Sequence, residues 1–349
     1  MPPPSRITLY IMNGQLAELF PAQNLPFFSQ SFLWDIYQWG IAVIRIIQEI
    51  KNPGLTALMK SITVLGTEAL YVPLILFIFW WVDEKRGLRL GILIIVSAWI
   101  NAFMKDLLKQ PRPFNLEPSL GLAVEHSYGA PSGHAQMSLC FWIPMAAWLE
   151  KLWPRRRALI WAAAIFFVLL IAYTRLYLGV HFPTDIFAGW ILAGIILFIW
   201  FIPGPRLENI FTSIDVRFRN ICAAVTALLM NGIYPRDRSL PALFLGFCLG
   251  YTLMRQRFPF SARAEINGKK PGIKVMIIRC LTGFAGMAII YLGLKLILPG
   301  DGSLFSVISF WGAASPYYEL GRFIRYALLG FWASAGAPRV FQHMGLAAK

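Results

Sequence analysis

The stretch ALIWAAAIFFVLLIAYTRLYLGVHFPTDIFAGWILAGIILFIWFI, residues 158–202, contains two long apolar runs separated by a short polar segment. Each run approaches the about 20 apolar residues that a helix needs to cross a membrane. The segment between the runs carries Arg175, His181 and Asp185, although the whole chain has only four histidines. Two adjacent spans are therefore predicted to enclose a group of polar side chains at one membrane surface.

The overall composition is that of a membrane protein. Apolar residues make up 57% of the chain and charged residues 14%, with a mean hydropathy of +0.59, whereas soluble domains carry about 25% charged residues. We predict an all-α polytopic membrane helix bundle. Apolar segments of spanning or near-spanning length occur at residues 66–82, 88–104, 132–149, 157–174, 184–202, 240–254, 274–298 and 320–336.

The order of these segments suggests four regions. An N-terminal segment, 1–53, contains FLWDIYQWGIAVIRIIQEI, whose charged residues predict an amphipathic helix in the membrane interface. A core follows at 54–203. A charged connector, 204–239, includes the short apolar stretch ICAAVTALLMNGI, and whether this stretch crosses the membrane is left open. A C-terminal region with additional transmembrane helices covers 240–349.

The net charge of +15 comes from short basic clusters between the apolar segments. This pattern follows the positive-inside rule and contacts with anionic headgroups. No nucleic-acid recognition motif accompanies it, so no nucleic-acid partner is expected. The rule places the loops 83–89 and 150–157 in the cytoplasm. The loops 105–131 and 175–183 should then face the periplasm or exterior of a plasma or inner membrane, or the lumen of a eukaryotic endomembrane.

The first candidate motif is NAFMKDLLKQPRPF, residues 101–114. Lys105 and Arg112 are seven residues apart, so they share a face if the helix continues. Pro111 and Pro113 should end the helix near Arg112. The two cations could bind an anion, but by themselves they also fit a helix end that interacts only with the helix dipole.

The second motif is GAPSGHAQMSL, residues 129–139, which should open a new helix. Free N–H groups around Ser132, Gly133 and His134 would form an anion site, because the donors and the helix dipole both point at the ligand. Each residue alone also has a simpler interpretation, and an ordinary N-cap is favoured for Ser132.

The third motif lies in the opening stretch. Pro183 suits the first turn of a helix, and Asp185 follows His181 by four residues, close enough to orient its imidazole. A carboxylate on one ring nitrogen fixes the tautomer and raises the basicity of the other nitrogen, as a nucleophile or base requires. The alternative is a carboxylate placed for the helix dipole beside an interfacial histidine.

Together the three motifs place cations, helix amides and two histidines on one side of the membrane. Lys105, Arg112 and Arg175 would bind a phosphate-like anion with the amides. His134 and His181 would supply a proton donor and a nucleophile. The pattern contains no cluster of metal ligands, and none of the four cysteines has a metal-ligand or disulfide spacing. We therefore predict a phosphoryl-transfer site that uses no metal and no other cofactor.

The three motifs resemble, in order and spacing, those of the type 2 phosphatidic acid phosphatase superfamily, which includes lipid phosphate phosphatases and the more distant vanadium haloperoxidases. The matching residues are Lys105-x6-Arg112-Pro113, Pro131-Ser132-Gly133-His134 and Arg175-x5-His181-x3-Asp185. Thr174 stands where many members carry serine and keeps a hydroxyl group. The resemblance covers roughly residues 55–203 and implies a six-helix phosphatase core, with the C-terminal region beyond it.

The resemblance also implies a mechanism. His181 would attack phosphorus to form a phosphohistidine, Asp185 would orient His181, and His134 would protonate the leaving alkoxide and then activate water. The equatorial phosphate oxygens would be held by Lys105, Arg112, Ser132, Gly133 and Arg175. The protein is thus expected to be a metal-independent membrane phosphatase acting on a lipid phosphate.

Several alternatives stay open. The same site could serve a lipid phosphotransferase or a non-catalytic lipid-phosphate binding or transport protein. A haloperoxidase is disfavoured because those relatives are soluble. The substrate could be phosphatidic acid, phosphatidylglycerol phosphate, a sphingoid phosphate, an isoprenyl diphosphate or phosphorylated lipid A, with glucose 6-phosphate less favoured. The glycine pairs Gly246 with Gly250 and Gly283 with Gly286 predict close helix packing, within the chain or in a homodimer.

Overall fold

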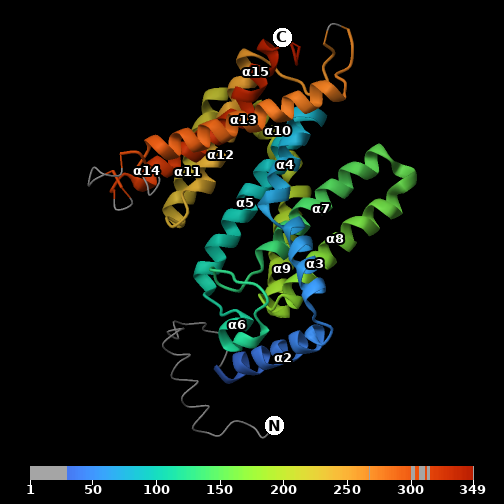
Figure 1. Cartoon of the computed structure of the whole chain (residues 1–349). Helices are drawn as coiled ribbons and strands as arrows, with labels where there is room; N and C mark the ends of the chain where they lie inside the picture. The colour runs from blue at the N-terminus through green and yellow to red at the C-terminus, as the bar shows by residue number, and fades with distance from the viewer. Residues whose placement is uncertain (1–29, 267, 300–302, 306–310, 313–314, 349) are drawn as a thin grey trace, which may run out of the picture. The chain divides into compact units, whose positions relative to one another are not determined.

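The computed structural model of the chain describes residues 30–266, 268–299, 303–305, 311–312 and 315–348 (Figure 1). Regular structure in these ranges is helical apart from one isolated bridge between Ile266 and Lys269, which confirms the all-α prediction. Predictions for residues 1–29 lie outside the described residues. The elements are α2 (Gln30–Gln48), α3 (Pro53–Thr63), η1 (Val64–Gly66), α4 (Glu68–Phe77), η2 (Ile78–Val82), α5 (Glu84–Leu108), α6 (Pro113–Leu116), η3 (Pro118–Leu120), α7 (Gly133–Leu152), η4 (Pro154–Arg156), α8 (Arg157–Tyr177), α9 (Pro183–Phe201), α10 (Gly204–Ser213), α11 (Val216–Ile233), α12 (Ser239–Arg257), α13 (Ile273–Ile297), α14 (Tyr318–Phe331), η5 (Trp332–Gly336) and α15 (Ala337–His343).

The described chain divides into two compact units. Unit 1 takes its residues from Met1–Thr67 and Asn101–Gly194, and unit 2 from Glu68–Ile100 and Ile195–Lys349. Helices α5 and α9 contribute residues to both units. All eight predicted site residues belong to unit 1. The four regions predicted from the sequence, 1–53, 54–203, 204–239 and 240–349, do not coincide with these two units and stay a prediction.

Four helical segments are long and apolar enough to cross a membrane, and a fifth arises if Pro53–Gly66 and Glu68–Val82 form one bent span. The segments predicted at 132–149, 240–254 and 320–336 form helices that fall short of this criterion within the described chain. Polar and charged residues lower the hydropathy of α7 and α12, and α14 has only 14 residues. The four segments are Glu84–Leu116, Pro154–Tyr177, Pro183–Phe201 and Ile273–Ile297.

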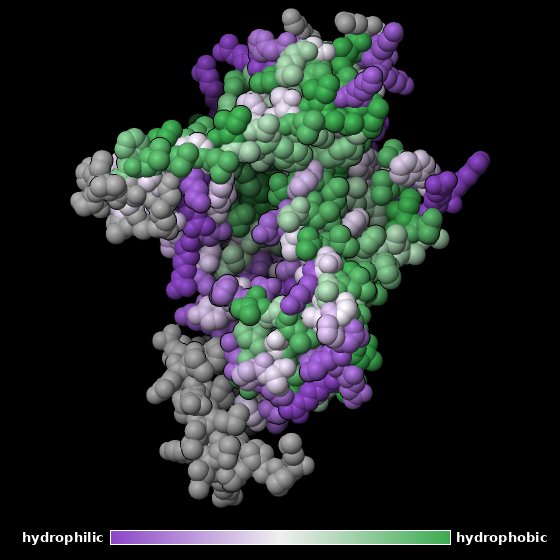
Figure 2. Space-filling view, in the orientation of Figure 1, coloured by the Kyte–Doolittle hydropathy of each residue, from purple (hydrophilic) through white to green (hydrophobic). Residues whose placement is uncertain are grey.

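In unit 1, α7 and α8 form a helical hairpin, and α2 and α3 pack against α8. The tip of the hairpin is the short basic helix η4, which contains Arg155 and Arg156. Figure 2 shows this tip as hydrophilic and the flanks of the hairpin as apolar. Exposed apolar side chains on α8, such as Phe166 and Leu169, suit a surface that faces lipid chains.

Helix α2 has one buried face, as an amphipathic helix requires. Ile41, Ile44 and Gln48 are buried at spacings of three and four residues, whereas Trp39 and Ile46 are exposed. A helix thus lies where the amphipathic helix is predicted, and its place in the membrane interface stays a prediction. The Nε2 of Gln48 donates to the backbone oxygens of residues 120 and 177, at 2.9 and 2.8 Å, and so joins α2 to the segments beside the site.

The segment between α8 and α9 is fixed by burial of all its residues. Leu178, Val180 and Phe182 are each at most 1% exposed, which holds His181 in one position between them. Gly179 has a φ of +65°, and a Cβ there would lie 1.9 Å from the nearest backbone oxygen. Only glycine fits this close approach without strain.

Unit 2 is built around α12 and α14. A Cβ at Gly246 would lie 1.8 Å from the carbonyl oxygen of Ala327, and a Cβ at Gly250 would lie 2.2 Å from the hydroxyl of Ser334. These glycines therefore let two helix backbones approach within one chain. Gly283 likewise meets the ring of Trp80. The packing is intramolecular at these positions, and a homodimer stays an untested prediction.

Candidate active site

The third sequence motif forms a buried histidine–carboxylate pair. The Nδ1 of His181 lies 3.2 Å from Oδ2 of Asp185, and both side chains are buried. The backbone N–H of Phe182 donates to the same Oδ2 at 2.9 Å. Helix α9 begins at Pro183, as predicted, so the i, i+4 spacing brings the two side chains together in the first turn. The carboxylate leaves Nε2 of His181 as the outward-facing ring nitrogen.

The first motif brings Arg112 to that nitrogen. Helix α5 ends at Leu108, before Pro111, as predicted from the two prolines. Arg112 then stands immediately before α6 and is 2% exposed. Its Nη1 donates to the carbonyl of Val180 at 2.8 Å and lies 3.3 Å from Nε2 of His181. A guanidinium is thus held directly beside the imidazole.

The loop that follows α6 wraps around the cations. The Nε of Arg112 donates to the carbonyl of Ser127 at 2.6 Å, and its Nη2 donates to the Ser127 hydroxyl at 3.0 Å. Lys105, on the last turns of α5, donates to the carbonyl of Tyr128 at 2.7 Å. One short loop therefore fixes the side chains of both cations of the first motif.

The second motif joins the same cluster. Ser132 occupies the N-cap position of α7, as predicted, but its hydroxyl makes no capping hydrogen bond. The prediction that its backbone N–H is free is wrong, because this N–H donates to the carbonyl of Asp185 at 2.9 Å. That bond ties the start of α7 to the start of α9. Gly133 and His134 form the first turn of α7, and His134 is half-buried.

A polar pair on α5 and α7 supports this turn. The Nδ2 of Asn101 donates to Oε1 of Gln136 at 2.8 Å and to the carbonyl of Pro131 at 3.3 Å. Asn101 and Gln136 are both buried. The polar residue at the end of the α5 apolar run thus faces the second motif and positions it.

Arg175 completes the cluster and has a partner that the motifs did not indicate. Its Nη2 donates to the carboxylate of Glu125, and its Nη1 donates to the hydroxyl of Thr63 at 2.9 Å. Glu125 also lies 3.8 Å from Nη2 of Arg112. Sequence reasoning missed Glu125 because it lies in an irregular loop. The one signal was a lone acid in a segment bordered by basic residues.

The charges in this cluster shift the pKa values of two groups that lie in loops. Burial is the main reason that the pKa of His181 falls well below its ordinary value, and Arg112 and Lys105 lower it further. Burial acts to raise the pKa of Glu125, but Arg175 and Arg112 outweigh it and hold that pKa below its ordinary value. At neutral pH, His181 is therefore an uncharged base and Glu125 an anion.

Two buried polar atoms in the cluster have no hydrogen-bond partner, the hydroxyl of Ser132 and the Nε of Arg175. Both residues are at most 2% exposed. Buried polar groups are normally paired, and leaving one unpaired costs about 1–3 kcal/mol. A buried hydroxyl and a buried guanidinium N–H without partners are suited to an anionic ligand with several oxygen atoms.

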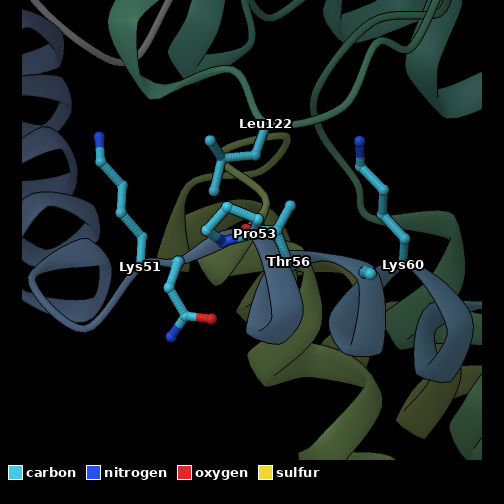
Figure 3. A pocket seen from close by; sticks show the side chains of 7 residues that line it. Lys51, Pro53, Thr56, Lys60 and Leu122 are labelled. Carbon is cyan, nitrogen blue, oxygen red and sulfur yellow. The ribbon is translucent and has the colours of Figure 1, made fainter.

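A separate cleft of about 420 Å³ lies at the start of α3. Figure 3 shows Lys51 and Lys60 on either side of Pro53, Thr56 and Leu122. None of the predicted site residues lines this cleft, which is open to solvent. The buried cation cluster and the open cleft are therefore two distinct features of unit 1.

These features are those of an integral membrane phosphoryl-transfer enzyme, since the cations, the unpaired donors and the His–Asp pair meet at the ends of apolar helices. Comparisons with known proteins give the family. The PAP2 superfamily pattern matches residues 86–206, and the pattern described as "PAP2 superfamily phosphatase, transmembrane extension" matches residues 239–349.

Two named relatives and one solved structure are similar to the chain. The chain is 31% identical over 164 residues to phosphatidylglycerophosphatase B of Bacillus subtilis, covering 45% of this chain and 78% of that protein. It is 25% identical to mouse (Mus musculus) sphingosine-1-phosphate phosphatase 2 over 322 residues, covering 85% of this chain and 90% of that protein. A solved transmembrane PAP2-type phosphatidylglycerolphosphate phosphatase from Bacillus subtilis is similar with a TM-score of 0.43 and 24% identity, covering 55% of this chain and 92% of that one.

The chain belongs to the PAP2 superfamily and is an integral membrane phosphoric monoester hydrolase. Its relatives are named as phosphatases of lipid phosphates. The match of the transmembrane-extension pattern to residues 239–349 shows that the C-terminal region also belongs to a known family of such phosphatases.

Proposed function

We propose that this protein removes the phosphate from a lipid phosphate monoester through a phosphohistidine on His181, without a metal. The observation that carries the proposal is the arrangement around His181. Asp185 holds Nδ1 at 3.2 Å, and the guanidinium of Arg112 lies 3.3 Å from Nε2. A phosphate bound to Arg112 would therefore lie next to the free ring nitrogen, as attack requires.

In the first step, Nε2 of His181 forms a bond to phosphorus while the bond from phosphorus to the lipid oxygen breaks. Asp185 stabilises the imidazole as it becomes positively charged. The departing alkoxide takes a proton from His134, which must enter this step protonated. The products of the step are the lipid alcohol and a phosphohistidine.

In the second step, His134 removes a proton from a water molecule and the water oxygen attacks phosphorus. The bond from phosphorus to Nε2 then breaks, which releases inorganic phosphate and restores His181. Lys105, Arg112 and Arg175 stabilise the charge on the equatorial oxygens in both steps, together with the Ser132 hydroxyl and the N–H groups at the start of α7. These cations supply the charge compensation that a metal ion supplies in other phosphatases.

The test is phosphate release by the detergent-purified chain from a panel of lipid phosphates, combined with acid-labile label trapping from a ³²P-labelled substrate. Wild-type protein should release phosphate and retain label that is sensitive to acid and stable to base, as a phosphohistidine is. His181→Asn should show neither. Release of phosphate without any labelled protein in a rapid quench would contradict the covalent step. Transfer of the label to an added lipid alcohol in place of water would identify a phosphotransferase.

We further propose that the site faces the periplasm or cell exterior. The loops 83–89 and 150–157 are rich in Lys and Arg close to span ends, where the positive-inside rule is most reliable. The loops 105–131 and 175–183 are also basic, but their cations Lys105, Arg112 and Arg175 are part of the proposed site, which gives this charge another explanation. A cysteine introduced at Ser119 should react with an impermeant thiol reagent in intact cells, and one at Arg156 only after permeabilisation. The parent protein controls for the native cysteines, and the reverse labelling would place the site in the cytoplasm.

A further inference from the structure

Glu125 is the most exposed charged partner of the buried arginines. Its side chain is 30% exposed, whereas those of Arg112 and Arg175 are 2% and 3% exposed. The unpaired hydroxyl of Ser132 and Nε of Arg175 also belong to fully or nearly fully buried residues. Glu125 therefore marks the side on which the cluster opens to its surroundings.

This position determines what Glu125 faces when a phosphate monoester is bound. The phosphate group would occupy the buried donors, so the atom that joins it to the rest of the substrate must lie toward the exposed side of the cluster. Glu125 lies on that side and is an anion at neutral pH, because the two arginines hold its pKa below the ordinary value. Its charge is thus placed to act on the leaving group more than on the phosphate itself.

The arginines use only part of the hydrogen-bonding capacity of this carboxylate. Oε1 accepts a bond from Arg175, while Oε2 lies 3.8 Å from Arg112, beyond hydrogen-bond distance. A carboxylate accepts about four hydrogen bonds. Oε2 is therefore able to accept a donor from a ligand, and a cationic donor would interact with it most strongly.

We propose that Glu125 selects substrates by the charge of the leaving group: it favours a leaving alcohol with an ammonium near the phosphate, tolerates an uncharged one and disfavours an anionic one. The inference rests on the proposed function and narrows it. Among the substrates left open by the sequence, it favours sphingoid base phosphates, whose amine lies two carbons from the phosphoester oxygen. It disfavours isoprenyl diphosphates, whose leaving group is itself a phosphate.

The experiment compares three lipids in mixed micelles, a sphingoid base phosphate, phosphatidic acid and an isoprenyl diphosphate, by kcat/KM. The test variant is Glu125→Gln, which keeps the shape and removes the charge, and Glu125→Asp restores the charge. The matched control is Glu117→Gln. Glu117 is a similarly half-buried carboxylate between Arg112 and Gly133, but it pairs with Arg45 at 2.6 Å and makes no hydrogen bond or ion pair with the cluster in the described chain.

The expected result is a change whose sign follows the charge of the leaving group. Glu125→Gln should lower kcat/KM for the sphingoid base phosphate and raise it for the diphosphate, each on the order of tenfold, the effect of one charge interaction at several ångströms near a protein surface. Phosphatidic acid should change by less than about threefold, since its leaving group has no charge to interact with Glu125. Glu125→Asp should return the three values toward wild type, and Glu117→Gln should leave them unchanged.

Other outcomes overturn the inference in distinguishable ways. An equal loss on all three lipids in Glu125→Gln would show that Glu125 only holds Arg175 in place. No change on any of them would show that its charge does not reach the leaving group. A wild-type protein that prefers the diphosphate to the sphingoid base phosphate would contradict the selection directly. If wild-type protein turned over none of the three lipids or any other lipid phosphate, the proposed function itself would fail.

Discussion

Both units of the molecule bury arginines, and Arg175 of unit 1 and Arg279 of unit 2 differ in what they bind. In unit 2, Arg279 is 0% exposed, and its Nε, Nη1 and Nη2 donate to the backbone carbonyls of Trp80, Ala262 and Leu346 at 2.7 to 2.9 Å. In unit 1, Arg175 is 2% exposed, but its partners are side chains and its Nε has none.

This difference indicates that Arg279 has a structural role, whereas Arg175 has hydrogen-bonding capacity left for a ligand. Backbone carbonyls are fixed by the fold, so the guanidinium of Arg279 has no reason to exchange them for another partner. The side chains of Glu125 and Thr63 can rotate, and the unpaired Nε of Arg175 gains a partner only when a ligand arrives. Burial alone therefore does not identify a functional arginine, and in this pair it is the kind of partner, together with the unpaired donor, that distinguishes Arg175 from Arg279.

The largest effect on activity is expected from removing the imidazole of His181. His181→Asn should reduce phosphate release below detection, because the described cluster contains no second group held by a carboxylate beside Arg112. His134→Ala should slow turnover by about 10²–10⁴-fold, the usual contribution of a general acid or base. The slowing should be smaller for a substrate with a good leaving group. Activity near wild type in His181→Asn would refute the mechanism.

The comparison of the two arginines can be tested by the same substitution in both. Arg175→Met should lower kcat/KM by about 10²–10³-fold, as loss of a charge-stabilising donor does, with little loss of thermal stability. Arg279→Met should leave three buried carbonyls without donors, at about 1–3 kcal/mol each, and so lower the stability of unit 2. The readouts are phosphatase kinetics and the denaturation midpoint in detergent. If both variants lost mainly stability, Arg175 would be a structural arginine as well.

Sequence reasoning succeeded for features that depend on residues close together in the chain, such as helix ends at prolines and contacts between residues four apart. The end of α5 before Pro111, the start of α9 at Pro183 and the contact of His181 with Asp185 all follow from short-range spacing. It failed where a partner is distant in the sequence. Glu125 reaches Arg175 across 50 residues of chain, and no periodicity in an irregular loop indicates that contact.

The Ser132 hydrogen bonds show the same limit in more detail. Its N-cap position was predictable, because a proline and a serine precede an apolar helix. The bond from its N–H to the carbonyl of Asp185 was not, because it depends on how two helix starts approach each other. The role of Arg279 was also not indicated, since a charge inside an apolar segment does not reveal that its partners are backbone carbonyls.

A smaller effect is expected in the stability of the protein at acidic pH. The folded state keeps the pKa of His181 well below its ordinary value of about 6.5. Below pH 6.5 the unfolded chain therefore binds a proton that the folded chain does not, so stability falls as pH falls, by at most about 1.4 kcal/mol per pH unit from this group.

The measurement is the denaturation midpoint of wild type and His181→Asn at several pH values between 5 and 7.5, the range set by the ordinary histidine pKa of about 6.5. The variant should lose less stability than wild type on acidification. His126→Asn removes an exposed histidine of the active-side loop and is the matched control. Equal acid sensitivity in wild type and His181→Asn would show that His181 is not kept uncharged by the fold.

The smallest effect is expected from chelation. Chelation distinguishes a phosphatase that neutralises the charge of the phosphate with arginine and lysine side chains from one that uses a metal ion. In the proposed mechanism Lys105, Arg112 and Arg175 neutralise the phosphate, and the groups around them hold all three side chains in place. EDTA should therefore leave kcat/KM unchanged within error. Vanadate should inhibit competitively, because its trigonal bipyramidal adduct resembles the transition state, and Arg175→Met should weaken that inhibition while Arg279→Met should not. Loss of activity on chelation that is restored by Mg²⁺ would mean that the arginines do not provide the main charge compensation, and the contrast between Arg175 and Arg279 would then need another explanation.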